Sequence, residues 1–63
     1  MPLQTAKDFA AAAANMGLLA TQFKPDDTDP YAGGRRLIQY HLSAAANVAR
    51  QIAEALAKTE AQG

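Results

Sequence analysis

The sequence predicts an all-α fold, a two-helix antiparallel hairpin that assembles into a four-helix bundle or a higher homo-oligomer. Three observations lead to this prediction. Apolar residues recur at alternating spacings of three and four in two long segments, and no segment alternates with period two. Alanine, the strongest helix former, occupies sixteen of the 63 positions. One stretch rich in proline and aspartate separates the two segments, so residues 1–63 are expected to form a single helical-hairpin domain.

The first helix is expected over residues 5–23. Thr5, followed three residues later by Asp8, is typical of an N-cap with an acidic residue in the first turn. Gly17 interrupts the helical pattern, and it is either a tolerated imperfection or a point where another backbone approaches closely. The apolar stripe of this segment consists of Phe9, Ala13, Met16, Ala20 and Phe23.

The connection is expected over residues 24–34. Pro25 and the residues around it cannot continue the first helix. The second helix has two candidate starts. Asp29-Pro30 offers an N-cap followed by proline at the first helical position, whereas Arg35 is the start if Gly33-Gly34 weakens the first turn. The sequence therefore leaves open whether the glycine pair lies inside the second helix.

The second helix is expected from residue 30 or 35 to residue 59, longer than the first by roughly 10 Å at about 1.5 Å per residue. Its apolar stripe consists of Ile38, Leu42, Ala45, Ala49, Ile52 and Leu56. The stripe is broadened by Leu37, His41, Val48 and Ala55. The opposite, polar face is expected to carry Gln39, Ser43, Asn47, Arg50, Glu54 and Lys58. This segment is therefore predicted to be a long amphipathic helix.

The chain is too small to bury a large core. Only fifteen apolar residues are larger than alanine, and below roughly 70–80 residues a single core rarely contributes more than about 3–5 kcal/mol. Because cysteines are absent, disulfides cannot compensate. A second copy of the chain is the remaining source of stability. The residues expected at that oligomer interface are Phe9, Met16, Phe23, Ile38, Leu42, Val48, Ile52 and Leu56.

Composition and spacing argue against an enzyme, a metal site and a cofactor. His41 and Ser43 are two positions apart, so they face different sides of a helix and do not form a nucleophile–base pair. The loop acids lack the glycine and the glutamate that a calcium-binding EF-hand loop requires. With six basic and six acidic residues the net charge is zero, which argues against DNA binding. No catalytic residue, metal or cofactor is expected.

The segment Gly33-Gly34-Arg35-Arg36 has two interpretations. Flexible glycines and two guanidinium groups are suited to hold the phosphate of a nucleotide near a helix N-terminus. The alternative is that the arginines pair with the acidic residues of the turn, since the first 34 residues carry a net charge of −2 and the last 29 carry +2. The candidate ligand-binding residues are Tyr31, Arg35, Arg36, Tyr40 and His41.

The second segment also resembles a known family. An arginine near the start of the helix, followed by Tyr40-His41-Leu42 and then Ala44-Ala45-Ala46, is similar to the small bacteriophage proteins that sequester cyclic oligonucleotide signals, the anti-CBASS sponges. The tryptophan common late in that helix is absent, with Val48 or Ala49 in its place, and the first segment shows no clear match. The resemblance implies an oligomer of helical hairpins that binds its ligand at a subunit junction.

The expected function is that of a small non-enzymatic helical interaction or regulatory protein that binds itself and another protein. The alternative is a phage counter-defence sponge that binds a cyclic nucleotide or oligonucleotide through the candidate ligand-binding residues.

The sequence contains no segment expected to cross a membrane. The uncharged run Phe9–Phe23 has 15 residues, whereas a membrane-spanning helix needs about 20. No signal peptide is recognised, so a cytoplasmic location is expected.

Overall fold

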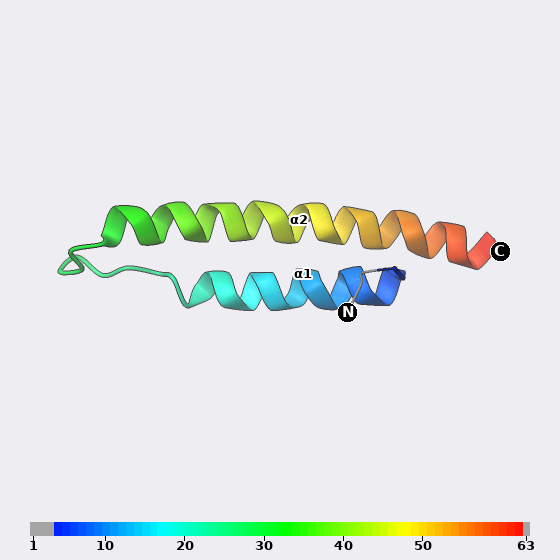
Figure 1. The fold of residues 1–63 in the computed structure, drawn as a ribbon, viewed down its shortest axis with the longest axis horizontal. Coiled ribbons are helices and arrows are strands. Elements are labelled where there is room, and N and C mark those ends of the chain that lie inside the picture. The colour runs from blue at the N-terminus through cyan, green and yellow to red at the C-terminus, as the bar shows by residue number, and fades with distance from the viewer. Residues whose placement is uncertain (1–3, 63) are drawn as a thin grey trace.

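The computed structural model of the chain describes residues 4–62. It contains two helices, α1 (Ala6–Thr21) and α2 (Ala32–Gln62), which lie antiparallel side by side (Figure 1). Within residues 4–62 every regular element is helical, which confirms the predicted all-α hairpin. The Cα atoms span 52 × 19 × 13 Å, so the hairpin is a flat slab. Assembly of such hairpins into a four-helix bundle stays a prediction.

Helix α1 begins with the expected cap. The backbone N–H of Asp8 donates to Thr5 Oγ1 at 3.2 Å, and the N–H of Thr5 donates to Asp8 Oδ2 at 3.0 Å. These reciprocal bonds form a capping box, which satisfies two backbone donors that the helix itself leaves free. Asp8 Oδ2 also accepts from the N–H of Gln4 at 3.1 Å.

Helix α1 ends at Thr21, two residues before the expected end. The N–H groups of Gln22 and Phe23 donate to carbonyls three residues earlier, at 3.0 and 3.2 Å, so the last turn tightens. Pro25 disfavours helical backbone at the residue before it, so the chain leaves the helix here. Phe23 lies beyond the helix but stays half-buried.

Helix α2 begins at Ala32, between the two expected starts. Asp29 Oδ1 accepts the N–H of Tyr31 at 2.8 Å, and the N–H of Arg35 donates to the Tyr31 carbonyl at 3.0 Å as the first helical hydrogen bond. Gly33 and Gly34 therefore lie inside the helix, and both have negative φ, as any residue in a helix does.

Helix α2 ends at Gln62, three residues beyond the expected end. With 31 residues against 16 in α1, it is longer by about 22 Å at 1.5 Å per residue, twice the expected difference. The first turns of α2 extend past the end of α1 and lie beside the connection between the helices (Figure 1).

Alanines form the contact between the helices. The buried residues are Ala13 and Ala20 of α1 and Ala46, Ala49 and Ala53 of α2. Phe9, Met16, Leu42 and Leu56 are half-buried at neighbouring positions of the same pattern. Small side chains on α2 let the helix axes approach closely, and the larger side chains of α1 fill the space beside them.

The stripe of α2 that faces α1 differs from the expected one. The expected stripe included Ile38, Ala45 and Ile52, all of which are exposed. The observed stripe, called here the inner stripe, consists of Gln39, Leu42, Ala46, Ala49, Ala53 and Leu56. Gln39 was expected on the polar face, and this was wrong because its Nε2 donates to the carbonyl of Ala20 at 3.2 Å.

Candidate interaction surface

A second apolar stripe runs along α2 directly beside the inner stripe. This outer stripe consists of Ile38, His41, Ala45, Val48, Ile52 and Ala55, again at alternating spacings of three and four. Each member precedes a residue of the inner stripe by one position, so the outer stripe is turned by about 100° around the helix. All six residues are exposed. Helix α2 therefore has two seams, of which α1 covers one.

The large members of the outer stripe remain partly exposed in the single chain. Ile38 is 43% exposed, Val48 is 54% exposed and Ile52 is 38% exposed. On α1, Leu19 directly precedes the buried Ala20 and is 43% exposed. Antiparallel helices place such preceding positions on the same side of the hairpin, so Leu19 extends the apolar surface of the outer stripe onto α1.

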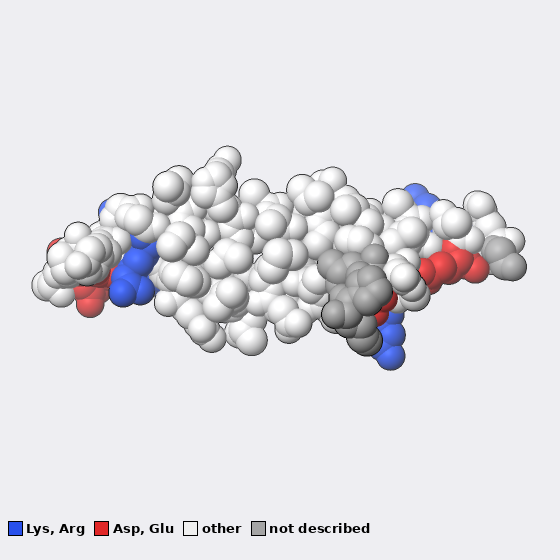
Figure 2. Space-filling view, viewed as in Figure 1, with Lys and Arg blue, Asp and Glu red and all other residues white. Residues whose placement is uncertain are grey.

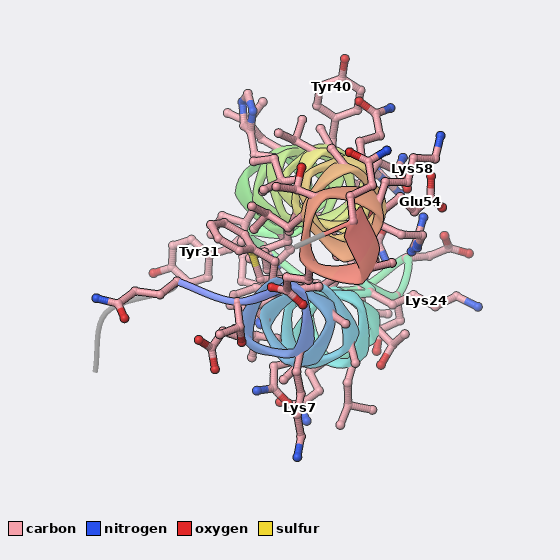
Figure 3. All side chains as sticks on the ribbon, turned by 90° about the vertical axis from the view of Figure 1, so that its right-hand side faces the viewer. Lys7, Lys24, Tyr31, Tyr40, Glu54 and Lys58 are labelled. Atoms are coloured by element: carbon pink, nitrogen blue, oxygen red, sulfur yellow. The ribbon has the colours of Figure 1, made fainter. Side chains whose placement is uncertain are left out.

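The two broad faces of the slab differ in character. In the end-on view of Figure 3, Tyr31 points to the left, while Lys24, Glu54 and Lys58 point to the right or upper right. Glu54 follows the inner-stripe residue Ala53 by one position, whereas each outer-stripe residue precedes an inner-stripe residue by one, so the outer stripe lies on the side opposite to Glu54, the left of this view. The left of Figure 3 is the side that faces the viewer in Figures 1 and 2. We call this side the broad face.

The middle of the broad face carries no charged side chain in the part that Figure 2 draws in white. Lysine, arginine, aspartate and glutamate atoms gather toward the two ends of this view (Figure 2). The sequence agrees, because no member of the outer stripe is a lysine, arginine, aspartate or glutamate. The broad face is therefore long and free of charged side chains along its centre, with its aliphatic residues mainly on α2.

The structure divides the predicted interface residues into two groups. Three of them, Ile38, Val48 and Ile52, are exposed on the broad face. The other five are half-buried within the hairpin: Phe9, Met16, Phe23, Leu42 and Leu56. The sequence interpretation joined the two seams of α2 into one broad stripe, and Leu19 was missed as an exposed apolar residue. Two interleaved repeats, one residue apart, were the signal that could have separated the seams.

The candidate ligand-binding residues do not converge within one chain. Arg35 Nε forms an ion pair with Asp29 Oδ2, the one ion pair among residues 4–62. This is the pairing with an acidic turn residue that the alternative interpretation predicted for Arg35, and a ligand-binding role of Arg35 stays a prediction. Tyr31 and Tyr40 are both exposed and point in different directions (Figure 3). The Tyr40 ring instead lies edge-on to the neighbouring ring of His41, with centroids 5.4 Å apart. Arg36 is exposed as well.

The acidic turn is organised by local hydrogen bonds. Asp26 Oδ1 accepts from the N–H of Thr28 at 2.9 Å and from its hydroxyl at 2.8 Å, and these bonds hold the pKa of Asp26 below its ordinary value of 3.8. Asp29 accepts the hydrogen bond from the N–H of Tyr31 and forms the ion pair with Arg35. Within residues 4–62, His, Asp and Glu side chains nowhere gather in a group of three suited to a metal ion.

Comparison with known proteins gives no family assignment for the chain. Neither helix in the described range is long and apolar enough to cross a membrane. No protein-family model, no curated protein and no solved structure matches this sequence.

Proposed function

We propose that this protein is a non-enzymatic helical interaction module that associates with further helices through its broad face. The proposal rests on the outer stripe, which presents three large aliphatic side chains to solvent along one uncharged surface. Contiguous apolar patches of this kind are rare on proteins that act alone and are typical of association sites. The inner stripe already packs on α1 within the hairpin, so a further helix would pack on the outer stripe.

The energetics of the single chain support the same proposal. Within residues 4–62 the five buried apolar residues are all alanines, the smallest apolar side chains. Burial of apolar surface contributes about 25 cal/mol per Å², so a core of alanines gives a narrow margin over chain entropy. Covering Ile38, Val48 and Ile52 adds the aliphatic burial that the hairpin lacks.

The test is sedimentation velocity over a range of concentrations, together with native mass spectrometry of protein purified without denaturation. The expected result is a defined oligomer that dissociates on dilution. Val48→Glu places a charge in the middle of the outer stripe and is expected to give a monomer, because the charge would be buried unpaired. A chain that sediments as a monomer at every concentration would contradict the proposal.

Tyr40→Glu is the matched control for Val48→Glu. Both positions are exposed on α2, at 68% and 54%, but Tyr40 points upward in Figure 3, past the α2 edge of the slab and off the broad face on the left. The control is expected to keep the oligomer of the unmodified chain. If both variants dissociate equally, added charge rather than the broad face decides the association.

The nucleotide-binding alternative makes a different prediction for the arginines. Since the five candidate residues do not converge in one chain, a nucleotide site would need residues from more than one copy. Replacing Arg35 and Arg36 together by alanine should then remove retained nucleotide mass in native spectra. Under the interaction proposal, the same double variant keeps its oligomer and loses only the Asp29 ion pair, worth at most about 1 kcal/mol at this exposure.

A further inference from the structure

We infer that the occupant of the broad face is a second copy of this chain, packed face to face about a twofold axis that crosses α2 between Ala46 and Asn47. This inference rests on the proposed function, because it names the partner of the same surface. The axis pairs α2 with the partner's α2 in antiparallel orientation and closes a four-helix bundle. Closure leaves no apolar broad face uncovered on either copy.

Side-chain size along the outer stripe favours this axis. Rotation about the twofold axis between Ala46 and Asn47 places Ile38 opposite the partner's Ala55. The same operation places Ala45 opposite the partner's Val48. Each of these layers combines one large and one small side chain, so the volume per layer stays even, as close packing requires. His41 falls opposite the partner's Ile52, a layer of two large side chains, so four of the six layers combine a large with a small side chain.

A parallel pairing of the same stripes packs poorly. It would place Ile38 on the partner's Ile38 and Ala45 on the partner's Ala45. Four layers would then hold two large side chains, and the two layers at Ala45 and Ala55 would hold two small ones, with crowding in the former and cavities in the latter. The outer stripe is thus self-complementary in the antiparallel orientation only.

The register of the hairpin is compatible with the same axis on α1. Among the described residues, two hydrogen bonds tie the helices together, from the Ala6 N–H to Glu60 Oε2 and from Gln39 Nε2 to the Ala20 carbonyl. Residue numbers at one level of an antiparallel pair have a constant sum, and these two bonds, both made by long side chains, give sums of 66 and 59. The level midway between Ala12 and Leu19, at 15.5, therefore lies opposite a point between 43.5 and 50.5 on α2, and this range contains the proposed axis.

This register allows α1 a matching layer. The axis that pairs the outer stripes of α2 also places Ala12 opposite the partner's Leu19, again one small and one large side chain. Leu19 is 43% exposed in the single chain and would be covered there. One symmetry operation therefore covers the exposed aliphatic residues of the outer stripe together with Leu19 of α1.

The other face-to-face arrangement sets α2 on the partner's α1. The positions of α1 that correspond to the outer stripe include Asp8, Asn15 and Gln22. These polar side chains would then face the aliphatic residues of α2 and would lose water without matching partners. Pairing α2 with α2 keeps the polar positions of α1 away from the aliphatic residues of the outer stripe.

The broad face is large enough for a stable dimer. Figures 1 and 2 view the slab down its shortest axis, so the face has Cα extents of 52 and 19 Å. These extents outline about 1,000 Å², while a standard protein interface buries about 800 Å² on each partner. Helices of two hairpins stacked in this way form the layers of a four-helix bundle.

Spin-label distances test the axis. The chain has no cysteine, so Lys58→Cys and Ala44→Cys each give one labelling site per copy. Both positions are exposed on α2. About the proposed axis, the two copies of residue 58 are separated along the bundle by about 35 Å and the two copies of residue 44 by about 8 Å, at 1.5 Å per residue. Pulsed dipolar electron paramagnetic resonance measures the long distance between the labels at residue 58. Dipolar broadening of the continuous-wave spectrum measures the short distance between the labels at residue 44.

The outcomes separate this inference from the proposed function. A dimer with the long distance at residue 58 and the short distance at residue 44 supports the axis. Equal distances at the two positions would overturn it while leaving the interaction module intact, because a parallel pair or α2 on the partner's α1 brings identical residues level. A monomer at all concentrations would overturn both. Ala44→Cys and Lys58→Cys must each sediment like the unmodified chain, which confirms that the labels leave assembly unchanged.

Discussion

Glu60 accepts a hydrogen bond from the backbone N–H of Ala6, at 2.8 Å and across 54 positions of sequence. Ala6 is the first residue of α1, and its N–H is one of the donors that a helix cannot satisfy internally. The carboxylate also lies at the positive end of the α1 dipole. This one contact ties the start of α1 to the last turns of α2.

Replacing Glu60 by alanine is expected to lower the free energy of unfolding by about 0.5–1 kcal/mol, the range for an exposed charged hydrogen bond. In hydrogen-exchange measurements, the backbone amide of Ala6 should exchange faster in this variant than in the unmodified chain. Glu54→Ala is the control, because Glu54 points away from α1 (Figure 3). Equal losses of stability in the two variants would contradict a specific role for Glu60.

Acid is expected to loosen the start of α1. Hydrogen bonds from the backbone of Thr5 and Gln4 and from the Thr5 hydroxyl hold the pKa of Asp8 below its ordinary value of 3.8. Because the folded pKa is lowered, Asp8 stabilises the fold above pH 3.8 and loses this contribution as pH falls through the lowered pKa. Melting temperatures between pH 2 and 6 should fall less steeply in Asp8→Asn, with the remaining slope due mainly to Asp26. An unchanged slope would count against the capping box.

Enlarging the alanine seam is expected to destabilise the hairpin. Ala49 is 7% exposed, so Ala49→Leu forces the helices apart and should lower the free energy of unfolding by about 1–3 kcal/mol. Ala44→Leu adds the same atoms to an exposed position of the same helix and should change stability by less than about 0.5 kcal/mol. Chemical denaturation measures both. A stable Ala49→Leu protein would show that the helices are not held close by alanine.

Gly17→Ala is expected to stabilise the chain by about 0.5–1 kcal/mol, because a helical glycine loses more entropy on folding than alanine. A Cβ at this position meets nothing within 4 Å, so the hairpin itself does not need the glycine. Gly17 follows Met16 on the side of α1 away from the broad face, so the variant should keep the oligomer of the unmodified chain. Loss of the oligomer by sedimentation, with a more stable monomer, would mean that another copy approaches Gly17 instead.

Most local structure of this protein follows from its sequence. Thr5 and Asp8 define the start of α1 because a cap needs only residues three apart, and Asp29 prepares the start of α2 in the same local way. The proline-rich turn fixes where the chain reverses. For the candidate site, the pairing of Arg35 with an acidic turn residue could be predicted from charge alone, since both lie in one short segment.

The choice between the two seams of α2 depended on tertiary packing. Both seams have helical spacing and apolar residues, so periodicity cannot rank them. Helices pack at the separation that their contact residues permit, and alanines at positions 46, 49 and 53 permit a closer approach than Ile38 and Ile52. The alanine seam therefore faces α1, Gln39 turns inward to donate to Ala20, and the larger aliphatic side chains remain on the broad face.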